Sequence, residues 1–179
     1  MDMLETICSR RSIRKYLDKP VEPEKIDSLL KAAMYAPSAM NEQPWRFIVI
    51  SDRSLFGKIM RAHPYASMLN SAPLAILVCG DTSLEKAPGN WPLDCSNATQ
   101  NMLLAAHALG LGAVWCGVYP ERDRMNALAG MFHLPGTVLP FALVAVGYAD
   151  SRPAPPSQRF NPERVCLNDW SNRYPARGA

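Results

Sequence analysis

Three arginines and a serine hydroxyl stand within five residues near the start of the chain, in the run Arg10-Arg11-Ser12-Ile13-Arg14. The planar guanidinium group of arginine forms bidentate, charge-assisted hydrogen bonds to phosphate oxygens, which the point charge of lysine cannot match. Each such bond contributes about 1.5 to 3 kcal/mol. The run predicts a site for an anionic small molecule, with a solvated or loosely nucleic-acid-binding basic segment as the alternative.

Two further segments have compositions suited to binding a planar heterocycle. Residues 36–47 read APSAMNEQPWRF and join a predicted helix to a predicted strand through two prolines, a hydroxyl and two amides, which can offer directed hydrogen bonds. Residues 100–115 read QNMLLAAHALGLGAVW, a predicted helix rich in small residues that leads through Gly-x-Gly into a strand. Small residues allow close helix approach, so this helix could lie at the centre of a dimer or be packed within one subunit.

Length and composition favour a single soluble globular domain. The chain has 179 residues, of which 48% are hydrophobic, enough for a substantial core. No apolar run reaches the roughly 18 residues of a membrane helix, and the first residues lack the features of a signal peptide, so we expect a cytoplasmic location and no membrane partner. A net charge of +3, without aromatic residues in the basic run, argues against a nucleic-acid partner.

The cysteines and histidines predict neither a disulfide framework nor a metal site. The five cysteines are odd in number, widely spaced and without a C-x-x-C pair: Cys8, Cys79, Cys95, Cys116 and Cys166. We expect them to be small core residues or reduced surface thiols. The three histidines are far apart in sequence, and we expect each to have a structural or surface role.

Apolar spacing predicts helices and strands in mixed order. Helices are expected around residues 3–7, 23–36, 54–61, 94–109 and 121–131, and strands at 47–50, 74–79, 113–116 and 141–146. Residues 81–92 are expected to form a loop that could act as a lid, and Gly110 is expected to cap the longest helix. Taken alone, this order would allow an ordinary parallel α/β sheet.

The residues from about 150 onward predict an extended arm, because they are rich in proline. The arm also carries Phe160, Val165, Leu167, Trp170 and Tyr174, which make it too apolar to be simply disordered. We expect it to dock either on its own domain or on a second subunit, since exchange of terminal elements is a common route to a dimer.

Together the three motifs resemble the nitroreductase family of FMN-dependent oxidoreductases, from about Leu4 to Trp170. R-R-S-x-R, A-P-S-x-x-N-x-Q-P-W-x-F and Q-N-x-L-L-A-A-x-x-L-G-L-G-x-x-W occur in the family order, followed by Gly147 and by Arg159-Phe160 in the tail. The resemblance implies an α+β, nitroreductase-like fold with a central, mostly antiparallel sheet flanked by helices. It also implies one FMN-binding domain over residues 1–179, an intertwined homodimer with an extended C-terminal arm, and FMN at the interface.

The resemblance implies a role for each part of the basic segment. Arg10, Arg11 and Ser12 would bind the phosphate and ribityl end of FMN, with Arg159 from the tail beside them. Arg14 would lie near the pyrimidine edge of the flavin, where a fixed cation raises the reduction potential.

Other segments would meet the flavin ring. Pro37, Ser38, Ala39 and Asn41 would reach it from the partner subunit, and the backbone of Cys116, Gly117 and Val118 would lie at N5. Some members of the family have an acidic residue where Gly117 stands, so only the backbone role is transferred. In close relatives a histidine is expected at the position of Cys166, which leaves any role of that histidine unassigned here. Met40, Tyr65 and Trp91 are candidate walls of a substrate pocket, with packing as the alternative role for each.

The implied chemistry is a ping-pong reaction in which NADH or NADPH passes a hydride to flavin N5. An electron-poor acceptor such as a nitroaromatic, a quinone or an activated alkene would then be reduced. The flavin supplies the reactivity, so no catalytic acid or nucleophile of the protein is required. The alternatives are reductive dehalogenation, azoline dehydrogenation or flavin fragmentation on the same fold, and a non-catalytic flavin carrier or sensor.

Overall fold

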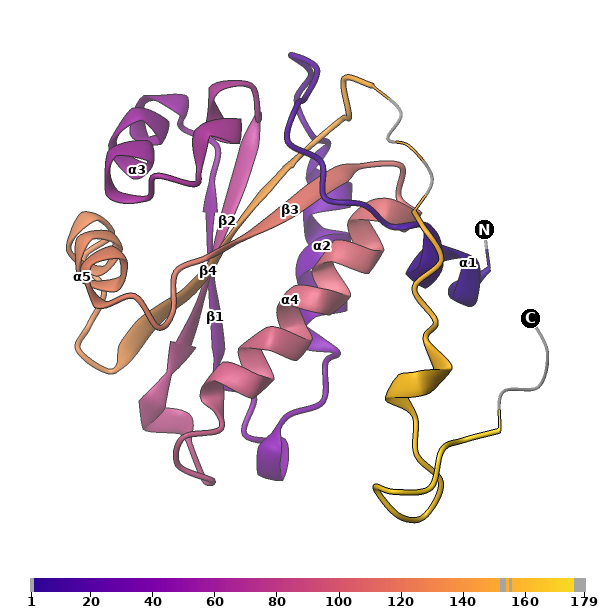
Figure 1. The fold of residues 1–179 in the computed structure, drawn as a ribbon. Coiled ribbons are helices and arrows are strands. Elements are labelled where there is room, and N and C mark those ends of the chain that lie inside the picture. Colours follow the sequence, from indigo (N-terminus) through magenta and orange to yellow (C-terminus); the bar gives the residue numbers. More distant parts are fainter. Residues whose placement is uncertain (1, 152–153, 155, 176–179) are drawn as a thin grey trace.

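The computed structural model describes residues 2–151, 154 and 156–175, and an antiparallel sheet forms its centre (Figure 1). The strands lie in the order β1 (Trp45–Ile50), β2 (Leu74–Asp81), β4 (Val138–Gly147) and β3 (Gly112–Gly117). All three neighbouring pairs are antiparallel. The α+β fold is confirmed, and the parallel sheet that the element order would allow is excluded.

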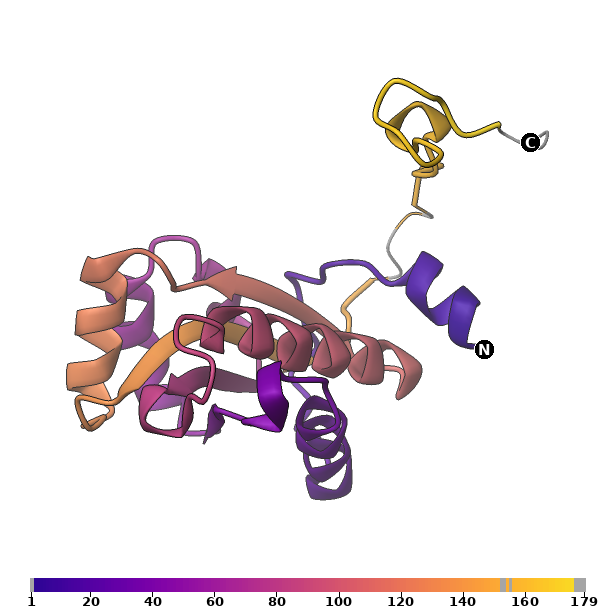
Figure 2. The same ribbon diagram turned by 90° about the horizontal axis from the view of Figure 1, so that it is seen from below.

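Helices cover both faces of this sheet (Figures 1 and 2). α2 (Pro23–Met34) and α4 (Trp91–Ala108) pack on one face, whereas α3 (Phe56–Ala62) and α5 (Arg122–Met131) pack on the other. The short α1 (Met3–Ser9) lies beside α4. The two central strands β2 and β4 are buried along almost their whole length, which explains why their sequences are continuously apolar rather than alternating.

The predicted elements are confirmed with small changes at their ends. Residues 54–61 form a 3₁₀ turn at Arg53–Leu55 followed by α3, rather than one helix. α4 begins at Trp91, before the expected start, because proline at the next position suits the first turn of a helix. Gly110, with φ of 75°, follows the end of α4 as a C-terminal cap does. Within residues 81–92, Asp81 ends β2 and Thr82–Leu84 form a 3₁₀ turn.

The cysteines occupy both of the expected environments, the core and the surface, and all five are free. Cys79, Cys95 and Cys116 are buried, whereas Cys8 is exposed and Cys166 is half-buried. Burial raises the pKa of the Cys116 thiol, so it stays protonated at neutral pH and is a poor nucleophile.

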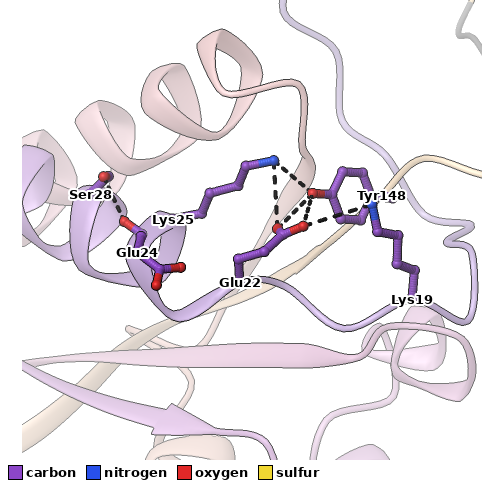
Figure 3. Close-up of polar contacts among 6 residues, drawn as sticks. All are labelled: Lys19, Glu22, Glu24, Lys25, Ser28 and Tyr148. Carbon is purple, nitrogen blue, oxygen red and sulfur yellow. Dashed lines mark hydrogen bonds and ion pairs between the residues drawn. The ribbon is translucent and has the colours of Figure 1, made fainter.

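A polar network fixes the chain where it enters α2 (Figure 3). The Tyr148 hydroxyl, at the end of β4, lies 2.6 Å from Glu22 Oε2 and 2.6 Å from Lys25 Nζ. The hydrogen bond from Tyr148 and the nearby lysines lower the pKa of Glu22 to about 2. Lys19 Nζ stands 3.9 Å from the centre of the Tyr148 ring, a cation–π contact. These contacts tie residues 19–25 to the sheet and so anchor the preceding basic segment.

The C-terminal segment 156–175 is largely irregular, with a 3₁₀ turn at Pro162–Arg164, and extends away from the sheet and its helices (Figure 2). Its apolar side chains have little to pack on, and Trp170 is 86% exposed. In the described part of the chain, no helix has the length and apolar character needed to cross a bilayer. The same residues contain no cluster of histidine, cysteine and carboxylate groups suited to a metal ion.

Candidate functional site

The basic segment runs along the free edge of β3. Ser12 forms a parallel bridge with Ala113, and the Ile13 N–H donates to the Ala113 carbonyl at 3.0 Å. Further on, Tyr16 pairs with Ala149, so the segment is fixed on both sides of Arg14. The arginines predicted to bind an anion therefore stand on a rigid edge rather than on a loose tail.

A first cavity of about 340 Å³ lies where α4 ends and β3 begins, and we call it the Arg10 cavity. Its cationic or titratable lining groups are Arg10, Arg11 and His107, and no carboxylate of the described residues lines it. Burial lowers the pKa of Arg10, and the positive charges of Arg159 and Arg11 lower it further. The structure therefore brings Arg10 and Arg11 together in one cavity, whereas Arg159 lines a separate hollow in the C-terminal segment. Positive charge without an acidic partner among the described lining residues suits an anion.

A second cavity of about 530 Å³ lies at the other end of β3, and we call it the Arg14 cavity. Arg14 and Arg124 supply its charges, and in the part of the chain that the structure describes no carboxylate lines it. The remaining lining residues are His63, Pro64, Tyr65, Ser67, Met68, Val114, Trp115, Cys116 and Gly117. The two cavities stand at opposite ends of one edge strand, with the basic segment between them. The arrangement suits an elongated ligand with an anionic end and a ring.

Three residues, Cys116, Gly117 and Val118, are predicted to lie at flavin N5. Of these, Gly117 alone points its N–H and C=O away from the neighbouring strand β4. The Val118 N–H donates to the Phe141 carbonyl at 3.0 Å, which makes this a hydrogen-bonded pair of the ladder. Such pairs alternate along an antiparallel ladder, so Cys116 also bonds inward while the N–H and C=O of Gly117 point away from β4. The Gly117 N–H is therefore directed to the free side of β3, and Gly117 is one of the residues that line the Arg14 cavity.

The outward carbonyl of Gly117 is held by two side chains. His63 Nε2 lies 2.9 Å from this oxygen, and Arg124 Nη1 donates to it at 3.3 Å. His63 is only 1% exposed, and burial lowers its pKa, so the ring is neutral near pH 7. A carbonyl only accepts hydrogen bonds, so the proton of the neutral ring resides on Nε2.

The segment predicted to meet the flavin from a second subunit lies at the opposite end of α4. Ala39 N–H donates to Asp94 Oδ1 at 2.9 Å, and Asn97 Nδ2 donates to the Pro37 carbonyl at 3.3 Å. At 1.5 Å of rise per residue, Asn97 is about 15 Å along the helix axis from His107 in the Arg10 cavity. Pro37, Ser38, Ala39 and Asn41 are thus kept together with one another but apart from the basic segment of the same chain.

This loop holds an unusual backbone conformation. Met40, Asn41 and Gln43 have φ of 46°, 52° and 49°, in the left-handed region that non-glycine residues rarely adopt. Strained backbone of this kind persists only where the surroundings fix it, and it is concentrated at functional sites.

The candidate pocket walls lie in three different environments. Tyr65 is exposed and lines the Arg14 cavity, and Met40 is exposed in the strained loop. Trp91 is only 6% exposed and packs edge-on against Tyr119 and Phe141, at ring separations of 5.0 and 6.0 Å. Its ring occupies the space that a side chain at Gly80 would need, so within one chain Trp91 is a core residue.

Three cavity residues were missed by the sequence reasoning. His107 belongs to the third motif, one turn before Gly110, and that position could have indicated it. His63 and Arg124 stand in no motif, and their contact with Gly117 joins parts of the chain that are distant in sequence. No signal in a single sequence reveals such a contact.

Comparisons with known proteins agree with this geometry. The model of the "Nitroreductase family" matches residues 7–62 and 54–148. The chain belongs to the nitroreductase family. A Methanothermobacter thermautotrophicus protein, provisionally named NADH dehydrogenase/NAD(P)H nitroreductase, is 52% identical over 170 residues, which cover 95% of this chain and 88% of that protein.

Two solved nitroreductase-family structures extend the comparison to three dimensions. A Parabacteroides distasonis protein with the same provisional name has a TM-score of 0.89 and 44% identity, covering 93% of this chain and 98% of that one. A provisionally named nitroreductase from Desulfovibrio desulfuricans, solved in complex with FMN, has a TM-score of 0.81 and 33% identity, covering 93% and 96%. The nitroreductase-like fold predicted from the sequence is confirmed.

Proposed function

We propose that the protein is an FMN-dependent oxidoreductase that uses NADH or NADPH to reduce electron-poor organic acceptors, such as nitroaromatics or quinones. The observation that carries this proposal is the pair of cationic cavities joined by the edge of β3, whose described lining residues include no carboxylate, with the outward Gly117 N–H at one of them. The FMN complex of the Desulfovibrio relative and the name of the Methanothermobacter relative support the choice of cofactor and reductant.

The residues present fit FMN. Arg10, Arg11, Ser12 and Arg159 would hold the phosphate and ribityl end, because guanidinium groups with no acidic partner favour a phosphate dianion. Arg14 would lie at the pyrimidine edge, and the outward N–H of Gly117 would meet N5. When bound, FMN supplies the acceptor and donor of hydride at its N5 atom. The protein would bind and orient both partners.

A homodimer would complete the site, since one chain holds the two halves apart along α4. Pro37, Ser38, Ala39 and Asn41 of a second subunit would then face the flavin bound by the first. An apolar groove of about 440 Å³ between α1, α2 and α4 supports this assembly. It is lined by Met3, Thr6, Ala32, Tyr35, Asn101, Leu104, Ala105 and Ala108. Burial of such a surface against a second copy would stabilise the dimer, and the exposed aromatic residues of the arm would add to the contact.

The acceptor would bind over the flavin between the two subunits. Tyr65 of one subunit and Met40 of the other are the proposed walls of its pocket, because both are exposed on the surfaces that would meet. Trp91 would support this region from the core. The proposed location of the protein remains the cytoplasm, as expected from the sequence.

Steady-state kinetics with NADH, NADPH and a series of nitroaromatics and quinones tests the proposal. A ping-pong mechanism predicts parallel lines in double-reciprocal plots, and sedimentation should give about twice the chain mass of 19.8 kDa. Turnover confined to a halogenated substrate, an azoline or the flavin itself would favour a specialised reaction. FMN binding without turnover of any acceptor would favour a carrier or sensor.

A further inference from the structure

We propose that Arg124 binds a negatively charged group of the electron acceptor, which makes aromatic acids the preferred class of acceptor. The inference deepens the proposed function and rests on it, because it names the substrate that the same site would take. It concerns a direct contact between the Arg124 guanidinium and the acceptor.

The charges that line the Arg14 cavity favour an anionic ligand. Among the described residues, the charged side chains that line it are Arg14 and Arg124. Its histidine, His63, is neutral near pH 7 because burial lowers its pKa. FMN would account for Arg14, which is proposed to lie at the pyrimidine edge of the flavin. Arg124 would then remain as a cation without a counterion.

The two arginines are anchored near different ends of β3. The Ile13 N–H, next to Arg14 in the chain, donates to the Ala113 carbonyl at 3.0 Å. Arg124 Nη1 donates to the Gly117 carbonyl at 3.3 Å. These anchor points are four residues apart on the strand, or about 13 Å at 3.3 Å per residue. Because the Gly117 N–H would meet flavin N5, Arg124 lies at the end of the site where the acceptor would receive its hydride.

Arg124 has unused donors and a restrained position. A guanidinium has five N–H donors, and in the described part of the chain the bond to Gly117 uses one of them. Its acidic neighbours on α5, Glu121 and Asp123, form no ion pair with it and line neither cavity. The guanidinium stands 5.2 Å from the centre of the Tyr65 ring, a cation–π contact. A side chain restrained in this way loses little further freedom when it binds a carboxylate.

Tyr65 gives this cation an aromatic neighbour. Its ring is 69% exposed and meets the buried His63 ring edge-on at 6.4 Å. An aromatic acceptor can pack on the exposed part of the Tyr65 ring while its carboxylate forms charge-assisted hydrogen bonds with Arg124. The pair therefore suits an aromatic acid better than a neutral ring or an aliphatic anion.

Three variants on α5 test the contact. Arg124→Met removes the charge and keeps an unbranched side chain, whereas Arg124→Glu reverses the charge. Both changes affect a partly exposed position and spare the core. Arg122→Met is the matched control, since Arg122 lies on the same helix, is exposed and lines neither cavity. The FMN affinity of each variant is measured alongside.

The first readout is binding without turnover. Benzoate and benzamide have similar shapes but differ in charge, and titration calorimetry with the oxidised, FMN-loaded protein gives both dissociation constants. Loss of a charge-assisted contact predicts about tenfold weaker benzoate binding in Arg124→Met and unchanged benzamide binding. Arg124→Glu should weaken benzoate binding further, because it places two like charges together. Arg122→Met should bind both compounds as the wild type does.

The second readout is the rate at which an acceptor oxidises the reduced flavin. The protein is reduced photochemically, so that no nucleotide competes for the site, and is then mixed without oxygen with 4-nitrobenzoate or 4-nitrobenzamide. The ratio of the two second-order rate constants cancels every effect that the acceptors share. This ratio should fall about tenfold in Arg124→Met and stay constant in Arg122→Met.

The outcomes separate this inference from the proposed function. Equal losses for the charged and the neutral compounds, or no loss for either, would overturn the recognition of charge by Arg124. Weaker FMN binding in Arg124→Met with an unchanged ratio would also overturn it, since Arg124 would then bind the cofactor. Wild-type protein that binds no FMN, or whose reduced flavin is oxidised by neither acceptor, would instead overturn the proposed function.

Discussion

Ile13 lies so close to Gly112 that any side chain at position 112 would force the two segments apart. A Cβ on Gly112 would stand 2.8 Å from three side-chain carbons of Ile13, a separation that real Cβ atoms essentially never show. This contact sets the distance between the basic segment and β3. It therefore controls where Arg10, Arg11 and Arg14 present their guanidinium groups.

Gly112→Ala should displace the basic segment from β3. Overpacking of this kind costs about 1 to 3 kcal/mol of stability. FMN affinity should fall more than the loss of stability alone explains, because the arginines lose their registration with both cavities. Thermal unfolding and FMN titration measure the two effects. Gly136→Ala is the control, since a Cβ there meets no atom within 4 Å, and equal FMN affinity in both variants would refute the argument.

Arg10→Ala should weaken FMN binding about ten- to a hundredfold, because it removes a charge-assisted bond worth about 1.5 to 3 kcal/mol. Fluorescence titration of FMN into flavin-free protein gives the dissociation constant. Arg61→Ala, on α3 and outside both cavities, should bind as the wild type does. If the Arg10 variant retained all its flavin through gel filtration, the phosphate role would be excluded.

Arg14→Ala should lower the reduction potential of the bound flavin and slow its reduction by NADH. A fixed cation beside the pyrimidine edge stabilises the negative charge gained on reduction, and each 1.4 kcal/mol lost lowers a two-electron potential by about 30 mV. Anaerobic titration against a reference dye measures the potential. Arg11→Ala should change affinity but not potential, and an unchanged potential in the Arg14 variant would contradict the placement of Arg14.

The wild type should lose stability as the pH rises, and the Asp94→Asn variant should not show this loss. The pKa of Asp94 is raised by burial and by the neighbouring Glu42, whose carboxylate accepts the N–H groups of Lys86 and Ala87. Glu42 Oε1 and Asp94 Oδ2 are buried and have no hydrogen-bond partner when both groups are ionised, so one proton shared between them satisfies the pair. The folded protein thus holds the Asp94 proton more tightly than the unfolded chain does.

The stability that this bound proton contributes is fully present below a pH of about 3.9, the pKa of the group in the unfolded chain. It is lost as the pH rises through the raised pKa of Asp94 in the folded protein. Asparagine donates to Glu42 at every pH, so the variant should gain about 1 kcal/mol, or about 2 to 4 °C in Tm, at pH 8 relative to pH 4 when compared with the wild type. Asp27→Asn, exposed on α2, is the control. Parallel Tm profiles of wild type and Asp94→Asn would show that the proton is not shared.

The sequence alone predicts the positions of the helices and strands well, because their apolar periodicity reflects the two faces of the sheet. It does not determine the direction of the strands. The continuous apolar runs of β2 and β4 suit a buried strand of either direction, and only the family resemblance indicated the antiparallel sheet.

The site is predicted only where its residues stand in local motifs, because contacts made by tertiary packing leave no local pattern in the sequence. Arg10, Arg14 and Gly117 stand in local motifs, and the structure places all three along one edge. The bond between His63 and the Gly117 carbonyl depends on tertiary packing, which no local pattern encodes. The left-handed conformation of Met40 likewise arises from the hydrogen bonds around its loop, since nothing in its side chain favours it.

The visible spectrum of the purified protein, before and after addition of NADH or NADPH without oxygen, tests the central claim most directly. A yellow protein, as isolated or after reconstitution with FMN, whose flavin absorbance bleaches on addition of the nucleotide is the predicted result. A protein that stays colourless after incubation with FMN, or a yellow one that neither nucleotide bleaches, would contradict an NAD(P)H-dependent flavin oxidoreductase.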